Sequence, residues 1–192
     1  MAHFMMKFKG KGSYGYIRQQ KILTILSTLL LFALALGFFF VGYYTTGTKK
    51  NLFTVVAILG ILPAAKSMVR AIMFLRYASL KKDTHDLYED RCAFLPVLYE
   101  NILTTSQRSY FVPLLVYANR SLAVLCEDAG DPEALQLHLH DSLKTAGSDV
   151  TVKVFTDSRL FFKRVDEMSH HGQDQDLQTS DTVFSTIKAL SL

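Results

Sequence analysis

The sequence predicts a membrane helical hairpin of two transmembrane α-helices, followed by a small cytoplasmic α/β (α+β) domain with a short three-stranded sheet. Residues 22–44 run for 23 residues without a charge, and a second apolar run begins at Leu52. The more polar remainder alternates between helical and strand-like patterns. A chain of 192 residues has room for one or two such units.

The charge distribution separates the two parts. Residues 1–82 contain twelve Lys or Arg and no acid, whereas residues 83–192 contain the other nine bases and all seventeen acids. A basic, acid-free half is compatible with nucleic-acid binding, but these bases flank apolar runs. We therefore expect anionic lipid as the partner and no nucleic acid. The segment 1–21 is predicted to be a basic juxtamembrane arm at the lipid surface.

Residues 22–44 are predicted to cross the membrane as a retained helix. At 1.5 Å per residue this stretch rises about 34 Å, which exceeds a hydrocarbon core of about 30 Å. A cleaved signal peptide is the alternative, because Ala33-Leu34-Ala35 weakly resembles a cleavage site. The apolar run continues nine residues beyond that tripeptide, which favours the retained span.

The second apolar run, 52–65, is short for a span, since it rises only about 21 Å. We predict a second span over about 52–70, in a hairpin covering 22–77. A charge at the centre of a span costs about 2.5–3.5 kcal/mol, and no acid in residues 1–82 can offset it. The cations that follow are therefore predicted to mark the exit from the membrane.

At this exit, long cationic side chains can reach the headgroups, aided by modest bilayer thinning. The alternative is an intramembrane cation that binds an anionic ligand or a partner's carboxylate. The candidate headgroup- or lipid-facing residues are Lys66, Arg70, Arg76 and Lys81.

The orientation follows from the Lys and Arg counts in the short flanks. Five precede the first span, two lie in the link 45–51, and five lie between Lys66 and Lys82. The positive-inside rule then places both termini in the cytoplasm, at the plasma membrane. Cys92 and Cys126 form no disulfide framework and are predicted to be buried, reduced thiols, in agreement with that compartment.

The domain is predicted to cover residues 78–168. Residues 83–105 show a mixed helical period that Pro96 interrupts, so one broken helix or two helices are expected. Strands are predicted over 109–117 and 121–127, as a β-hairpin that turns at Asn119. Pro113 cannot donate a ladder hydrogen bond and therefore argues for an edge strand or a bulge.

The second half of the domain is predicted to continue with a helix over 132–146, which Asp131 caps and Gly147 ends. An alternative strand reading of 135–140 stays open, because its apolar residues alternate. A strand over 150–155 can pair in parallel with one hairpin strand, and a helix is predicted over 158–168.

Residues 169–192 are predicted to form a polar linker and a C-terminal amphipathic helix. Four apolar side chains between residues 183 and 190 share one face of that helix. We expect this face to dock on its own domain, with the membrane or a partner as the alternatives.

Candidate chemistry is sparse. His138 and His140 point about 200° apart on a helix and cannot share a metal there, so both are predicted to be surface histidines. The acids Glu127, Asp128 and Asp131 follow the hairpin, where a metal-dependent nuclease would need a carboxylate–x–lysine pattern on a strand. No lysine stands there. No catalytic residue, cofactor or metal ligand is therefore assigned.

The predicted function is a membrane-tethered interaction, regulatory or sensing module, with a protein partner or a homo-oligomer as its context. An enzyme is the less favoured reading. The alternatives are a membrane-anchored enzyme whose site carries no recognisable motif and a subunit of a membrane transport complex. The transport reading needs a wet cavity between spans, which two helices alone cannot enclose.

Overall fold

The chain forms two compact units. Ile17–Ala78 make one, and the other combines the described residues up to Tyr16 with Ser79–Leu192. The structure is a computed structural model that describes residues 10–48, 51–93, 95–105, 108–170 and 177–192.

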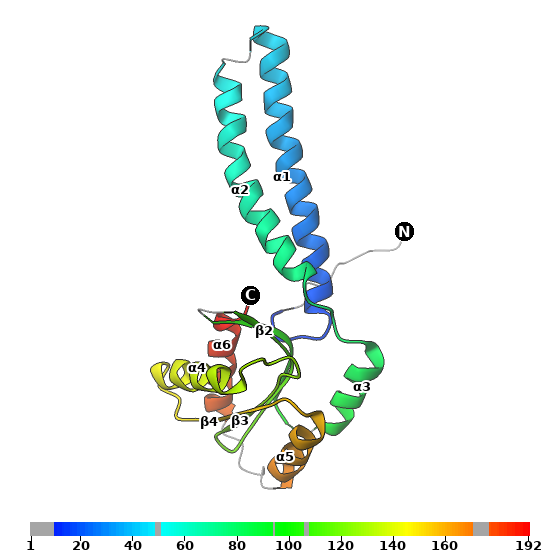
Figure 1. The fold of residues 1–192 in the computed structure, drawn as a ribbon, viewed down its shortest axis with the longest axis vertical. Coiled ribbons are helices and arrows are strands. Elements are labelled where there is room, and N and C mark those ends of the chain that lie inside the picture. Colours follow the sequence, from blue (N-terminus) through cyan, green and yellow to red (C-terminus); the bar gives the residue numbers. More distant parts are fainter. Residues whose placement is uncertain (1–9, 49–50, 94, 106–107, 171–176) are drawn as a thin grey trace. The chain divides into compact units, whose positions relative to one another are not determined.

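Two long helices build the first unit. Helices α1 (Tyr16–Thr46) and α2 (Leu52–Leu75) run antiparallel, side by side (Figure 1). By length and composition, both are apolar enough to cross a membrane. Helix α2 does not end at the first cations but continues through Lys66 and Arg70 as one helix.

The two helices meet through small residues. The Ser67 hydroxyl lies 3.0 Å from that of Ser27 and 2.8 Å from that of Thr28. A Cβ added to Gly60 would lie in van der Waals contact with Ala35, at 3.6 Å. Small residues let helix backbones approach closely, and hydroxyl pairs then fix their register. The small residues of this seam are Ser27, Thr28, Ala35, Gly42, Ala57, Gly60, Ala64 and Ser67.

Asn51 organises the start of α2. Its side-chain oxygen accepts a hydrogen bond from the Thr54 N–H at 2.8 Å, as an N-cap. Its amide nitrogen donates to the Thr46 hydroxyl and to the Thr48 carbonyl, both at 2.8 Å. One side chain thus connects the end of α1 to the beginning of α2.

The second unit contains a four-stranded mixed sheet, so the prediction of three strands is wrong. The strand order is β1-β2-β3-β4; the first two pairings are antiparallel, and β4 runs parallel to β3. The strands are β1 (Val97–Thr104), β2 (Ser109–Ala118), β3 (Ser121–Leu125) and β4 (Thr151–Phe155).

The additional strand comes from the segment 83–105, for which only helix was expected. Helix α3 (Lys82–Arg91) ends early, and β1 begins directly after Pro96. Leu98 and Ile102 stand four residues apart, which matches a helical period as well as a strand. Pairing with β2 decides the matter, because it buries both side chains and satisfies the backbone of the segment.

The predicted β-hairpin between β2 and β3 is confirmed. Asn119 and Arg120 have φ values of 49° and 56°, as a two-residue type I′ turn requires. Of the two alternatives inferred from Pro113, the edge strand is wrong, because β2 is an interior strand; the β1–β2 pairing is nevertheless interrupted at Pro113. Pro113 is tolerated there since the β2–β3 pairing begins only at Leu114, and the residue opposite Pro113 is Glu100.

Glu100 interrupts the regular alternation of β1. It has a φ of 51°, outside the extended region. Before it, Leu98 faces the apolar core on one side of the sheet; after it, Leu103 faces the same core although it is five residues away. The alternation of side chains between the two faces of β1 therefore shifts by one residue near Glu100. As a result, both halves of β1 keep apolar side chains in contact with the core.

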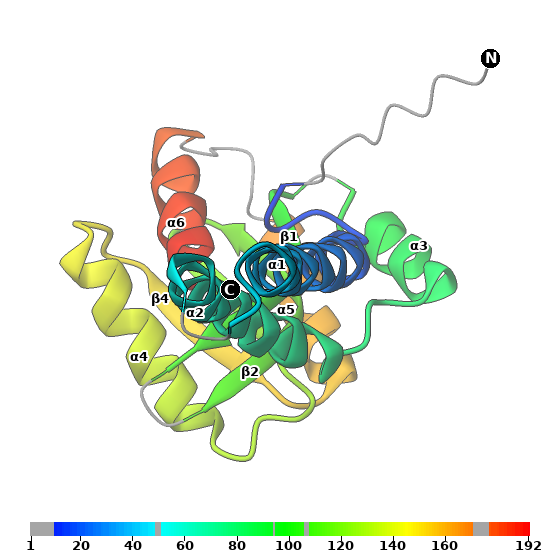
Figure 2. The ribbon, with the colours of Figure 1, turned by 90° about the horizontal axis from the view of Figure 1, so that it is seen from above.

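Helices cover both faces of the sheet (Figure 2). Helices α4 (Pro132–Thr145) and α6 (Leu177–Leu190) pack on one face and enclose the α4/α6 core. Helices α3 and α5 (Ser158–His170) pack on the other face and enclose the α3/α5 core. The result is a three-layer α/β/α domain around two apolar layers.

Three further expectations are settled by these helices. Asp131 caps α4 through a hydrogen bond from the Ala134 N–H at 3.0 Å, and the strand alternative for 135–140 is wrong. The C-terminal helix docks on its own domain, with Val183 and Ile187 fully buried. Of the expected linker 169–181, residues 171–176 lie outside the described part of the chain.

Candidate functional site

The two edges of the sheet differ in how the chain covers them. At β1, the Tyr99 N–H donates to the Gly12 carbonyl at 2.8 Å, and the Leu192 N–H donates to the Ile102 carbonyl at 3.0 Å. The segment before α1 and the C-terminus therefore pair with the β1 edge. Covering an edge in this way prevents another strand from adding to it.

The opposite edge, β4, presents its backbone outward at every second residue. The Thr151 N–H donates to the Arg120 carbonyl, and the Phe155 carbonyl accepts from the Cys126 N–H, both toward β3. Successive residues of a strand point their backbone groups to opposite sides. The N–H and C=O groups of Val152 and Val154 therefore point outward, away from β3.

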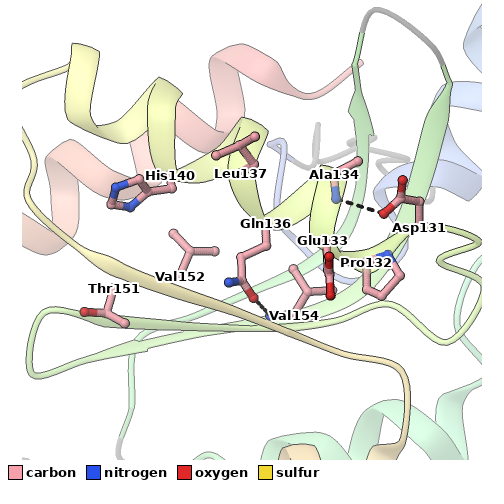
Figure 3. A pocket seen from close by; sticks show the side chains of 10 residues that line it. All are labelled: Asp131, Pro132, Glu133, Ala134, Gln136, Leu137, His140, Thr151, Val152 and Val154. Atoms are coloured by element: carbon pink, nitrogen blue, oxygen red, sulfur yellow. Dashed lines mark hydrogen bonds between the residues drawn. The ribbon is translucent and has the colours of Figure 1, made fainter.

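Side chains of α4 approach this outer edge. The Gln136 side-chain oxygen accepts a hydrogen bond from the Val154 N–H at 3.3 Å, and His140 Nδ1 lies 3.3 Å from the Val150 carbonyl oxygen (Figure 3). Between these contacts, the N–H and C=O of Val152 have no hydrogen-bond partner among the described residues. The edge is thus covered at two points and open between them.

An open groove of about 1020 Å³ runs along this edge beneath α4. Leu137 is 62% exposed and contributes an apolar wall. Asp131 and Glu133, both exposed, lie toward the Val154 end (Figure 3). The groove is lined by Asp131, Pro132, Glu133, Ala134, Gln136, Leu137, His140, Thr151, Val152 and Val154.

Such a groove offers backbone hydrogen bonds, apolar wall area and negative charge, which are the elements of recognition of an extended peptide. No local pattern in the sequence identifies this groove. The alternating pattern of 150–155 predicts a strand correctly, but nothing local says that this strand lies at the edge of the sheet. That position results from the crossover through α4, which places β4 beside β3 with no later strand to follow.

A second feature is the attachment of the two segments that lead into α1 and out of α2, here called the connectors. Before α1, the Gly12 carbonyl accepts from Tyr99, as described above. After α2, the Ser79 hydroxyl and the Leu80 N–H donate to the Glu100 carboxylate, the latter at 2.9 Å. Glu100 is only 1% exposed. Both connectors are thus hydrogen-bonded to consecutive residues of β1.

The segment from Gly10 to Tyr16, here called the strap, also contacts the C-terminus. Lys11 Nζ donates to the Ser191 carbonyl at 2.6 Å and to the Lys188 carbonyl at 3.1 Å. A cation near the last carbonyls of a helix is favourably placed in the field of its dipole. Tyr14 stacks on His85 with ring centroids 4.0 Å apart.

The four residues proposed from the sequence as headgroup-facing are all exposed, and none forms an ion pair with a described residue. Lys66 and Arg70 lie one turn apart on α2, and Lys81 precedes α3. Lys66 is adjacent to Ser67 and therefore level with Thr28 of α1. Thr28 stands six residues, or roughly 9 Å of rise, inside the apolar run that begins at Ile22.

The histidines do not converge on a site. His138 and His140 lie on different sides of helix α4, as expected, but both are half-buried rather than on the surface. The Nε2 atom of His138 is buried and has no hydrogen-bond partner among the described atoms. His170 and His171 offer no side-chain geometry, because their side chains lie outside the described part of the chain.

One group of metal-ligand type was missed. His85, Asp86 and Glu89 of α3 bring one donor atom each within 4.8 Å of one another. His85 Nδ1 lies 3.3 Å from the Asp86 carboxylate and 3.7 Å from that of Glu89. The i, i+1 and i+4 spacing on an exposed helix was the available signal. Pairs of an imidazole with exposed carboxylates, as here, also form without a metal.

Both cysteines are free and buried, as predicted. Burial raises the pKa of Cys92 to about 11, with a smaller effect of the Asp166 charge. Burial likewise raises the pKa of Cys126 to about 11. Burial, together with Cys92 and Glu89, raises the pKa of Tyr99 to about 12. These thiols are protonated at neutral pH, which disfavours nucleophilic chemistry.

The acids after the hairpin remain apart from a catalytic arrangement. Glu127 and Asp128 are exposed, and Asp131 caps α4. Strand β3 itself carries neither a carboxylate nor a lysine. Comparisons of the chain with protein-family models, curated proteins and solved structures returned no match.

Proposed function

We propose that the chain is an integral membrane protein that crosses the plasma membrane twice and holds an α/β interaction module on the cytoplasmic side. The length and apolar composition of α1 and α2 support the two spans. The distribution of Lys and Arg supports the orientation, with two in the link and five in each of the other flanks. Lys66 and Arg70 then meet anionic headgroups at the exit, through long side chains and modest bilayer thinning.

The observation that carries a regulatory or sensing role is the attachment of both connectors to β1. The strap is hydrogen-bonded to Tyr99, and the connector after α2 is hydrogen-bonded to Glu100. A displacement of either helix end pulls on adjacent residues of one strand. The module thus holds both connecting segments by hydrogen bonds within its own unit, and under this proposal those bonds respond to the separation of the spans.

The topology is tested by labelling two exposed positions with a membrane-impermeant maleimide. Thr48→Cys lies in the link, and Ser185→Cys lies on α6. We expect Thr48→Cys to react from outside intact cells, and Ser185→Cys to react only after permeabilisation. The native cysteines give little background because both are buried. Reaction of both positions on the same side would rule out the two-span arrangement.

The coupling is tested at the strap. Gly12 has a φ of 84°, and a Cβ there would lie 2.5 Å from Leu98 Cδ2, so Gly12→Ala displaces the strap. We expect amide exchange at Tyr99 to rise about fivefold, as loss of one hydrogen bond worth about 1 kcal/mol implies. In the native chain this exchange should differ between thin and thick bilayers.

The matched control is Gly10→Ala, because a Cβ at Gly10 meets nothing within 4 Å. It should leave exchange at Tyr99 unchanged. A native chain whose β1 exchange is identical in both bilayers would refute the sensing role, while the labelling result would still decide the topology.

A further inference from the structure

We propose that the groove along β4 binds an extended, basic segment of a partner protein, which adds to the sheet as a fifth strand. This inference deepens the proposed interaction role by naming the surface and the chemistry of its partner. It depends on the geometry of the second unit alone, so it can be tested separately from the membrane topology.

The first step is the contrast between the two sheet edges. The β1 edge is closed by backbone of the chain itself, through Gly12 and the C-terminal residues. The β4 edge receives only two side chains, Gln136 and His140, and the backbone of Val152 between them has no partner among the described residues. An unpaired edge is a template for an added strand.

The second step concerns what an added strand would contact. Gln136 holds the Val154 N–H with a long hydrogen bond of 3.3 Å, which a partner's carbonyl can replace. Leu137 stands over the same groove and is 62% exposed (Figure 3). Since side chains of a strand alternate between two faces, one face of the guest would turn toward α4, and its residue nearest Leu137 would pack against this leucine.

The third step is charge. Asp131 and Glu133 line the Val154 end of the groove, and neither Lys nor Arg is among the ten residues that line it. Residues 83–192 as a whole hold nine bases against seventeen acids. A Lys or Arg in the guest therefore meets complementary charge, whereas a second copy of this acidic domain is repelled. These charges favour a basic partner segment over self-association.

The experiment measures binding of synthetic heptapeptides to the full-length chain in nanodiscs. The peptides alternate Val with a second residue that is Lys, Gln or Glu. We expect the Lys peptide to bind at least about tenfold more tightly than the Glu peptide, and to slow amide exchange at Val152 and Val154. Equal binding of all three, or no binding, would overturn the proposal.

Two variants tie binding to the groove. Val152→Pro removes the outward N–H without touching the ladder to β3, which uses Thr151 and Phe155. Leu137→Ser removes the apolar wall without adding charge and leaves the backbone intact, so it decides the question if the proline variant fails to fold. Both should weaken binding of the Lys peptide about tenfold or more.

The matched control is Leu160→Ser, because Leu160 is similarly exposed, at 59%, but lies on α5 at the other face of the sheet. It should bind the Lys peptide normally. A different result would overturn the proposal: light scattering could show a dimer of the chain that the Leu137 substitution abolishes. The groove would then bind a second copy of the chain instead of a basic partner segment. Peptide binding unaffected by both groove variants would contradict the assignment.

Discussion

Glu100 shows how one residue can serve the backbone and a connector at once. Its φ of 51° turns β1 over, so that apolar residues on both sides of it reach the core. Its carboxylate is buried and accepts hydrogen bonds from Ser79 and Leu80. A buried carboxylate persists only when donors satisfy it, which explains how an acid is tolerated in the middle of a largely buried strand.

Replacing this carboxylate tests its role. Glu100→Gln keeps the shape but places an uncharged amide opposite two donors. We expect the free energy of unfolding to fall by about 1–3 kcal/mol in chemical denaturation. Glu127→Gln is the control, since Glu127 is exposed, and it should change stability by less than about 0.5 kcal/mol. Equal effects of the two variants would contradict a structural role for Glu100.

The cysteines predict a dependence of stability on alkaline pH. Burial raises the folded-state pKa of Cys92 and Cys126 from 9.0 to about 11. A raised pKa means that the folded state holds its proton more tightly than the unfolded state. The stabilisation is therefore complete below pH 9 and is lost as the pH rises toward 11.

We expect the denaturation midpoint to fall over that interval and both thiols to resist alkylation at neutral pH until the chain is denatured. Cys92→Ala combined with Cys126→Ala should reduce the alkaline loss. Rapid alkylation of the folded native chain at neutral pH would show that the thiols are not buried.

At the scale of elements, the seam between α1 and α2 explains how two apolar helices recognise each other. Leucine and phenylalanine side chains on the outside cannot drive specific pairing in lipid, because the acyl chains are equally apolar. Small residues and hydroxyl pairs do so instead. Ser67 contacts Ser27 and Thr28, and Ala64 is completely buried in the contact.

Enlarging the seam should separate the helices. Ala64→Leu inserts three heavy atoms where none fit, at a cost of about 1–3 kcal/mol. We expect disulfide crosslinking between engineered cysteine pairs in α1 and α2 to slow by about tenfold. Ala33→Leu makes the same change at an exposed position and should have no effect. Unchanged crosslinking in the Ala64 variant would show that the seam is not tightly packed.

At the scale of the whole molecule, our proposals give the acid-free half and the acidic half different partners. The exposed, unpaired cations after the apolar run of α2 favour anionic lipid, and the acidic groove along β4 favours a basic segment. Under these two proposals, the chain binds an anionic membrane and a basic protein segment through oppositely charged parts of its sequence.

The lipid part of this arrangement is testable by native mass spectrometry. Lys66→Leu combined with Arg70→Leu should reduce retention of phosphatidylglycerol severalfold relative to phosphatidylcholine. The domain should remain folded, because both residues lie on α2. Lys144→Leu with Arg159→Leu removes two exposed cations from the domain and should leave lipid retention unchanged. Equal retention by both double variants would exclude a lipid role for Lys66 and Arg70.

Local patterns in the sequence were sufficient wherever a local cause dominates. The uncharged length of 22–44, the cap at Asp131 and the turn at Asn119 each depend on neighbours within a few residues, and the structure agrees with all three. The segment after Pro96 was assigned wrongly because Leu98 and Ile102 satisfy a helical and an extended period equally well. Only pairing with β2 distinguishes the two.

The candidate groove lay beyond such reasoning altogether. The sequence by itself determined the apolar runs, the separation of charge, the caps and most element types, since these follow from composition and short spacing. The tertiary structure alone decided that β1 joins the sheet, that the strap and the C-terminus close its edge, and that β4 stays open. Those outcomes depend on which distant segments compete for the same backbone hydrogen bonds, and no local pattern records that competition.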